Sequence, residues 1–302
     1  MLRMVLSAAG GRRTQVAALV VASGIALGAC GSGVGADDVA GPAPLMASTT
    51  IWADITSHIA CGESVESIVP AGADPHHFEP SLRDRERLTK AGAVITNGAG
   101  LEESLADLVD TAAGDGVPVV AVADHVDVID GDPHIWQDPR RVLAAVDAIE
   151  PAVVAAGRDA AKIAACADAY RTELTALDDD VAVTLGAVPP ERRVLVTNHD
   201  AFAYFADRYE FEIVGTVIPS SSTLGEGSAG QLADLADAIE QHHVPAIFAE
   251  RLGSATEAEA LAKRLGVRVV ELVSDALESV GAASTYLGMM HANAAAIAAA
   301  LQ

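Results

Sequence analysis

Apolar positions along the chain alternate between two spacings. Short runs of β-branched and other apolar residues are typical of buried strands, and longer stretches with apolar residues three or four apart are typical of helices. In the first half of the chain, strands are expected at 48–52, 64–69, 93–97 and 118–122. Helical spacing occurs between and after them, at 53–60, 81–90, 102–112 and 141–157. Because strands that alternate with helices form parallel sheets, this half predicts an α/β lobe.

The longest helical pattern runs from Asp159 to about Leu185, with no proline or glycine before Gly186. Pro189 and Pro190 end it, and a second alternation begins. Its expected strands lie at 193–197, 212–217, 246–249 and 267–272. Its expected helices lie at 201–209, 229–242, 255–265 and 285–301.

The pattern therefore predicts an α/β protein of two lobes joined by one long rigid α-helix. Each lobe is expected to hold a mostly parallel four-stranded sheet flanked by helices. The predicted boundaries are an N-terminal lobe at 47–157, a linking helix at 158–186 and a C-terminal lobe at 187–302. Ligands of parallel sheets bind beyond the carboxyl ends of the strands, and two lobes can face these ends across a cleft.

The first 29 residues predict a signal peptide. Three arginines precede an apolar stretch at 16–27 that is too short for a relaxed membrane span. The stretch ends in Leu-Gly-Ala-Cys, which resembles a bacterial lipobox with Cys30 as the lipidated residue, although an ordinary signal peptide beside an unrelated cysteine is the alternative. Residues 30–46 are expected to form a flexible tether. We expect an exported protein on the outer face of the cytoplasmic membrane, or a soluble periplasmic one without the lipid.

The length and the acidic composition of the chain restrict the number of domains and the kinds of binding partner that are expected. Roughly 270 residues follow the signal peptide, enough for two modest domains. The 42 acidic residues outnumber 19 basic ones, and the net charge is −23. This charge argues against nucleic acid and anionic membrane surfaces as partners, and it is compatible with attracting cations.

Two further cysteines, Cys61 and Cys166, remain in a chain that is expected to be exported. An oxidising compartment favours one disulfide between them. The alternative is two buried free thiols, because cysteine also packs as a small apolar side chain. The sequence leaves both open, since it does not show how far apart the two Cα atoms lie.

The tripeptide Asp-Pro-His occurs twice, ending at His76 and at His134. Proline fixes its own φ and restricts the residue before it, so both histidines are expected on stiff loops after predicted strands. His77 shares the loop of His76, and His76 is preferred because it directly follows the proline. The acidic segment 124–132 holds His125, which is expected to be at most a transient metal contact.

In the second lobe, His199 and Asp275 each follow a predicted strand directly. Two side chains from each lobe would therefore converge on one cleft. Three imidazoles and one carboxylate suit Zn²⁺ and leave Mn²⁺ open. A single histidine is more often a polar group with ordinary partners, so the prediction depends on all four positions falling at strand ends.

Five motifs, in order, are ADPHHFEPS, TNGAGLE, DPHIWQDP, TNHDAFAYFADRY and VPAIFAE. With them, the chain from Thr49 onward resembles the zinc/manganese ABC-transporter solute-binding proteins, the ZnuA/TroA-like group of cluster A-I. The resemblance implies that His76, His134, His199 and Asp275 bind the metal. It also implies a group of residues that shape the cleft or support the ligands, namely His77, Glu79, Asn97, Trp136 and Glu250.

The resemblance further implies a monomer with small lobe motions, which docks onto a membrane permease served by an ATPase. One departure concerns the segment 124–132, where many zinc-specific members carry a long His-rich loop. This chain looks like the members without that loop, such as the AztC type, which leaves a zinc metallochaperone open as the metal donor.

The predicted function is that of a high-affinity Zn²⁺ solute-binding protein that captures the metal between two lobes and delivers it to an ABC importer. It is not expected to be an enzyme. The alternatives are a Mn²⁺ receptor of the same family, a surface adhesin, and an exported zinc hydrolase. A hydrolase needs an open coordination position and a general base. Glu79 and Glu250 are the candidates for that base, but neither lies in an HExxH arrangement.

Overall fold

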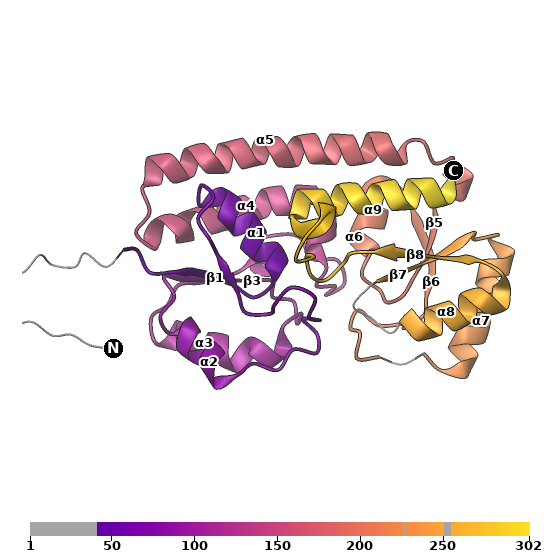
Figure 1. The fold of residues 1–302 in the computed structure, drawn as a ribbon, viewed down its shortest axis with the longest axis horizontal. Helices are drawn as coiled ribbons and strands as arrows, with labels where there is room; N and C mark the ends of the chain where they lie inside the picture. Colours follow the sequence, from indigo (N-terminus) through magenta and orange to yellow (C-terminus); the bar gives the residue numbers. More distant parts are fainter. Residues whose placement is uncertain (1–40, 226, 251–254) are drawn as a thin grey trace, which may run out of the picture. The chain divides into compact units, whose positions relative to one another are not determined.

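The computed structural model describes residues 41–225, 227–250 and 255–302. The predicted signal peptide, Cys30 and most of the predicted tether lie outside these ranges. Within them the chain forms two four-stranded parallel sheets flanked by helices, as the sequence predicts (Figure 1). No helix of these ranges is both long and apolar enough to cross a membrane.

The first sheet has the strand order β2-β1-β3-β4, and all its neighbours are parallel. Its strands are β1 Leu45–Ala47, β2 Glu66–Ser67, β3 Ala93–Thr96 and β4 Val119–Ala121. The helices of this lobe are α1 Thr50–Ile59, α2 Leu82–Leu88, α3 Ala106–Gly114 and α4 Pro139–Ala155. Helix α5, Ala160–Leu185, then leads to the second lobe.

The second sheet repeats this arrangement with the order β6-β5-β7-β8. Its strands are β5 Val194–Thr197, β6 Glu212–Thr216, β7 Ala246–Glu250 and β8 Arg268–Leu272. Its helices are α6 Ala203–Tyr209, α7 Ala229–Gln241, α8 Ala255–Leu265 and α9 Tyr286–Leu301. Short 3₁₀ helices occur at Glu103–Leu105, Val122–Asp124, Ile135–Gln137, Pro190–Arg192 and Ala282–Ser284.

The predicted first strand, 48–52, is wrong. The strand lies earlier, at Leu45–Ala47, and helix α1 already begins at Thr50. The side chain of Thr49 accepts a hydrogen bond from the backbone N of Trp52 at 3.3 Å, which caps the helix and prevents the strand from continuing. Leu45 and Met46, which fall in the predicted tether, are therefore buried strand residues.

Both sheets contribute one face to a hydrophobic core that the two lobes share. Along β1, Leu45 and Ala47 face this shared core, whereas Met46 faces a smaller core of the first lobe. Along β7, Phe248 faces the shared core and Ile247 faces a core of the second lobe. This alternation follows from the two-residue period of a strand. The shared core also includes buried residues of α5 and α9, two helices that pack against each other (Figure 1).

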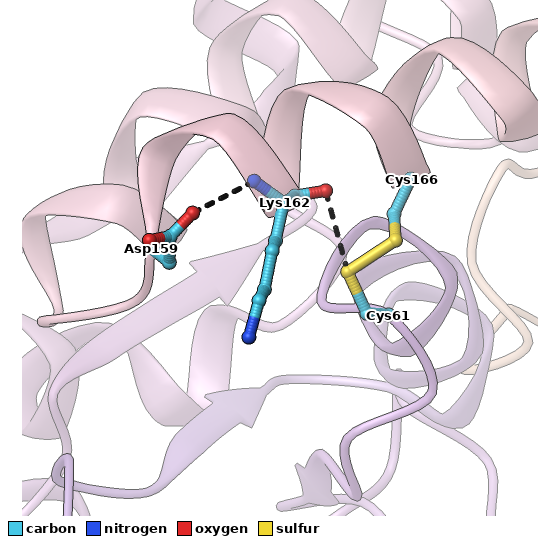
Figure 2. Close-up of a disulfide and its surroundings, with 4 residues drawn as sticks. All are labelled: Cys61, Asp159, Lys162 and Cys166. Atoms are coloured by element: carbon cyan, nitrogen blue, oxygen red, sulfur yellow. Dashed lines mark hydrogen bonds between the residues drawn. A yellow bond between two sulfur atoms is a disulfide. The ribbon is translucent and has the colours of Figure 1, made fainter.

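A disulfide joins Cys61 and Cys166, which decides between the two alternatives that the sequence leaves open. Cys61 follows helix α1, and Cys166 lies in α5, near the point where the Asp159 side chain caps the helix by accepting a hydrogen bond from the backbone N of Lys162 (Figure 2). The bond joins positions that are 105 residues apart in the sequence. It therefore fixes the start of α5 to the first lobe.

We expect the double substitution Cys61→Ala, Cys166→Ala to lower the free energy of unfolding by about 2–4 kcal/mol, because the unfolded chain loses a long closed loop. Urea unfolding followed by circular dichroism measures this change. The parent protein under reducing conditions is the matched control and should lose a similar amount. An unchanged urea midpoint in the variant would contradict this role of the disulfide.

Asp178, buried on α5, ties this helix to both lobes. It accepts hydrogen bonds from Arg140 of α4 at 3.1 Å and from Arg208 of α6 at 2.9 Å. The hydroxyl of Tyr209 lies 3.2 Å from the same carboxylate. Burial alone would raise the pKa of Asp178, but the hydrogen bonds from Arg208 and Arg140 outweigh it and lower the pKa.

Asp178→Asn should lower the free energy of unfolding by about 1–3 kcal/mol at pH 7, since it weakens charge-assisted hydrogen bonds to two arginines. A lowered pKa in the folded state contributes stability above the ordinary pKa, about 3.9, and this contribution is lost as the pH falls through the lower folded value. The difference between parent and variant should therefore shrink below about pH 4. Urea unfolding at several pH values measures it. The exposed Asp180→Asn on the same helix is the control, and an equal loss there would contradict the argument.

Candidate metal centre

The structure brings the four predicted ligands together. His76 lies between β2 and α2, His134 follows the loop after β4, His199 follows β5, and Asp275 follows β8. One ligand atom of each lies within 4.8 Å of the others. The side chains of His134, His199 and Asp275 are buried, whereas His76 is partly exposed. Each lobe thus supplies two side chains to the group.

The distances within this group fit one small cation. The Nε2 atoms of His134 and His199 are 3.2 Å apart. Asp275 places Oδ1 at 3.7 Å from Nε2 of His134 and Oδ2 at 3.6 Å from Nε2 of His199. Nitrogen and oxygen ligands at 2.0–2.1 Å from a tetrahedral Zn²⁺ would lie about 3.3 Å from one another. Nε2 of His76 and Oδ1 of Asp275 are among the buried side-chain atoms of the described residues that have no hydrogen-bond partner, which is compatible with a role as ligand atoms.

The aspartates of both Asp-Pro-His tripeptides position their histidines. One carboxylate oxygen of Asp74 accepts a hydrogen bond from the backbone N of His76 at 2.8 Å. Asp132 accepts one from the backbone N of His134 at 2.9 Å and also lies 2.7 Å from its Nδ1. With a proton on Nδ1, the free Nε2 of His134 faces the group. The repeated Asp-Pro-His tripeptides contain these carboxylates, but only their prolines entered the prediction.

His199 is oriented in the same way by Glu250, which ends strand β7. The Glu250 carboxylate contacts Nδ1 of His199, and both side chains are buried. This contact leaves Nε2 of His199 directed at His134 and Asp275. A carboxylate behind a histidine is the usual arrangement in metal sites, since it fixes the ring and increases its basicity.

The electrostatics of the group differ between the lobes. Burial lowers the pKa of His76 and of His134, so both imidazoles stay in the neutral form that binds metals. Burial also acts to lower the pKa of His199, but Asp275 and Glu250 outweigh it and raise the pKa to about 9. Burial raises the pKa of Glu250 to about 7 and that of Asp132 to about 6. The carboxylates are thus held at a cost that a bound cation would relieve.

Two of the expected supporting residues contact the ligand loops. Asn97 accepts a hydrogen bond from the indole of Trp52 at 2.9 Å and donates one to the carbonyl of Pro133 at 2.8 Å, which holds the loop of His134. Trp136 donates from its indole to the carbonyl of Ser274 at 2.9 Å, one residue before Asp275. Its ring also packs edge-on against His134.

The remaining two expected supporting residues, His77 and Glu79, are both exposed. The imidazole of His77 lies 3.8 Å from Asp74 and 3.4 Å from the hydroxyl of Thr223. Its neighbour His76 is the histidine that belongs to the group, and the Nε2 atom of His76 is buried without a hydrogen-bond partner. Thr223 and Tyr204, two hydroxyl residues of the second lobe, also contact the Asp-Pro-His loops, and no sequence pattern predicted them.

This two-lobed α/β fold, with its histidine and carboxylate group at strand ends of both sheets, defines a class of binding protein that takes a small cation. The sequence model of the zinc-uptake complex component A, periplasmic (ZnuA) matches residues 45–300. The chain therefore belongs to this family of metal-binding ABC-transporter substrate-binding proteins.

Individual relatives agree with this assignment. The zinc-binding protein TroA of Treponema pallidum is 33% identical over 96% of this chain and 99% of its own length. The manganese-binding lipoprotein MntA of Halalkalibacterium halodurans is 33% identical over 82% of this chain and 85% of its own. The solved structure of the periplasmic zinc-binding protein TroA superimposes with a TM-score of 0.81 at 31% identity, covering 86% of this chain and 99% of that one.

We expect Glu250→Gln to lower the pKa of His199 from about 9 toward its ordinary value, because the substitution removes one of the carboxylates that raise it. An NMR titration of the histidine Cε1 protons in metal-free protein measures the change. Glu79→Gln is the matched control, since Glu79 is exposed, and it should leave the titration as in the parent. A His199 pKa that is unchanged by Glu250→Gln would contradict the described contact.

Proposed function

We propose that this protein is a high-affinity Zn²⁺ receptor that captures the ion with His76, His134, His199 and Asp275 and delivers it to an ABC importer. The observation that carries the proposal is the convergence of these four side chains, two from each lobe, on one largely buried point. A metal ion bound there would bridge the lobes. A transporter could then distinguish the loaded receptor from the empty one by the relative position of the lobes.

The donor set supports zinc as the cargo. Three imidazole nitrogens and one carboxylate are ligands that Zn²⁺ accepts readily, and nitrogen-rich sites bind Zn²⁺ more tightly than Mn²⁺. The relatives differ in this respect, since one of the two at 33% identity is named zinc-binding and the other manganese-binding. Mn²⁺ is therefore the alternative cargo of the same site.

The arrangement also favours a receptor over an exported zinc hydrolase. Four protein ligands fill a tetrahedral coordination shell, whereas catalytic zinc sites keep one position open for water or substrate. Glu250, a candidate base of a hydrolase, is instead occupied with Nδ1 of His199. In this proposal the Glu250 carboxylate serves to orient a ligand and is not free to activate water.

We place the protein outside the cytoplasm, anchored through Cys30 and working with a membrane permease and its ATPase. Several relatives are named as substrate-binding lipoproteins of metal ABC transporters, which supports this location. A zinc metallochaperone that loads the receptor remains a prediction from the short segment 124–132 alone.

Calorimetry on the chain that follows Cys30 tests the metal site. Zn²⁺ should bind one to one with a Kd on the order of nanomolar, and His76→Ala or His134→Ala should each weaken binding by more than about 100-fold, beyond the loss typical of a residue that only supports a ligand. His125→Ala, on an exposed histidine outside the group, is the control and should bind as the parent does. Equal zinc binding without the two histidines would show that the site is elsewhere.

The same titration decides between the cargoes. If Zn²⁺ is the cargo, saturating Mn²⁺ should shift the apparent Zn²⁺ affinity only slightly, because the nitrogen-rich donor set favours zinc strongly. Mn²⁺ that competes with Zn²⁺ at comparable concentrations would instead support the manganese alternative.

A further inference from the structure

Each Asp-Pro-His loop of the first lobe is held by a hydroxyl group of the second lobe. The hydroxyl of Thr223, in the segment between β6 and α7, donates to Oδ2 of Asp74 at 2.6 Å. The hydroxyl of Tyr204, on α6, donates to the backbone carbonyl of Asp132 at 2.6 Å. In both cases a hydroxyl of the second lobe thus donates a hydrogen bond to the aspartate of an Asp-Pro-His loop of the first lobe.

The carboxylate of Asp74 connects Thr223 to the proposed metal ligand His76. Asp74 uses Oδ1 to accept from the backbone N of His76 and Oδ2 to accept from Thr223. The carboxylate therefore connects the ligand loop directly to the second lobe. A shift of this loop relative to the second lobe would break one of these hydrogen bonds.

The Tyr204 contact has a second component. Its hydroxyl also accepts a hydrogen bond from the backbone N of Ile129 at 3.0 Å, so it holds both ends of the turn that leads into Asp132. The ring of Tyr204 is buried, and the guanidinium of Arg141 stacks 4.6 Å from its centroid. Tyr204 follows His199 closely in the sequence, so one short segment carries a ligand and also the hydroxyl that holds the loop of His134.

We infer that Tyr204 and Thr223 are positioning residues that couple metal capture to contact between the lobes. This inference rests on the proposed function. A hydroxyl contact that forms only when the loops and the second lobe meet stabilises the arrangement in which all four ligands converge. By reciprocity, such a contact strengthens metal binding by the same factor by which the metal strengthens the contact. The effect should appear mainly in the rate at which the metal leaves.

The experiment uses Tyr204→Phe and Thr223→Val, which remove the hydroxyl groups and keep the shapes of the side chains. Zn²⁺ release into an excess of chelator, followed by stopped flow on the chain after Cys30, should be about 3–10-fold faster in each variant, the change expected from one net hydrogen bond. The association rate should stay within about 2-fold of the parent. Because the contacts lie on different loops, the two effects should multiply in the double variant.

Two kinds of control separate coupling from a general loss of stability. Thr223→Ser keeps the hydroxyl and should release Zn²⁺ at nearly the parent rate. Tyr209→Phe removes a tyrosine hydroxyl that contacts Asp178 instead of a ligand loop. A merely structural hydroxyl lowers the unfolding temperature equally with and without Zn²⁺, as we expect for Tyr209→Phe. A coupling hydroxyl reduces the increase in unfolding temperature that Zn²⁺ causes, as we expect for Tyr204→Phe and Thr223→Val.

Unchanged Zn²⁺ release in both variants would overturn the inference, and so would a zinc-induced stabilisation equal to that of the parent. Either result leaves the proposed function intact, because the parent still binds the metal. A parent protein that binds neither Zn²⁺ nor Mn²⁺ would instead defeat the proposed function, and this inference with it.

Discussion

The packing of both sheets against one hydrophobic core is the constraint on which the rest of the structure depends. Helices α5 and α9 contribute to this core together with inward-facing residues of both sheets. With both sheets packed on one core, the loops after β2, β4, β5 and β8 converge, and the side-chain atoms of the four proposed ligands fall within 4.8 Å of one another. The disulfide and Asp178 support the same packing, since each fixes α5 to the elements around it.

Buried carboxylates fix the orientation of two of the proposed ligands, His134 and His199. Asp132 and Glu250 stand behind His134 and His199 and leave the Nε2 atoms of both rings directed at each other. Burying these acids is costly, as the raised pKa values of both show. In the proposed site, a divalent cation at the centre would offset the cost of burying these carboxylates.

The sequence was sufficient to predict the features that depend on local pattern. The alternation of strands and helices gave both lobes, and the position of each ligand after a strand followed from it. The first strand was misplaced because a single cap, Thr49, turns an apolar run into a helix. The contacts of Glu250, Tyr204 and Thr223 could not be predicted, because they join segments far apart in the chain and leave no periodic signal.

The shared core also bears on how a bound metal could leave. Opening the lobes widely would expose apolar side chains from both sheets, α5 and α9, at about 25 cal/mol for each Å². The contacts beside the site cost far less to break, since each net hydrogen bond contributes only about 0.5–1.5 kcal/mol. Small displacements of the two Asp-Pro-His loops against the second lobe are therefore the least costly route to release. In the proposed site each lobe supplies two ligands, which suits this route, because moving one loop by a small distance would already remove one of the four proposed ligands.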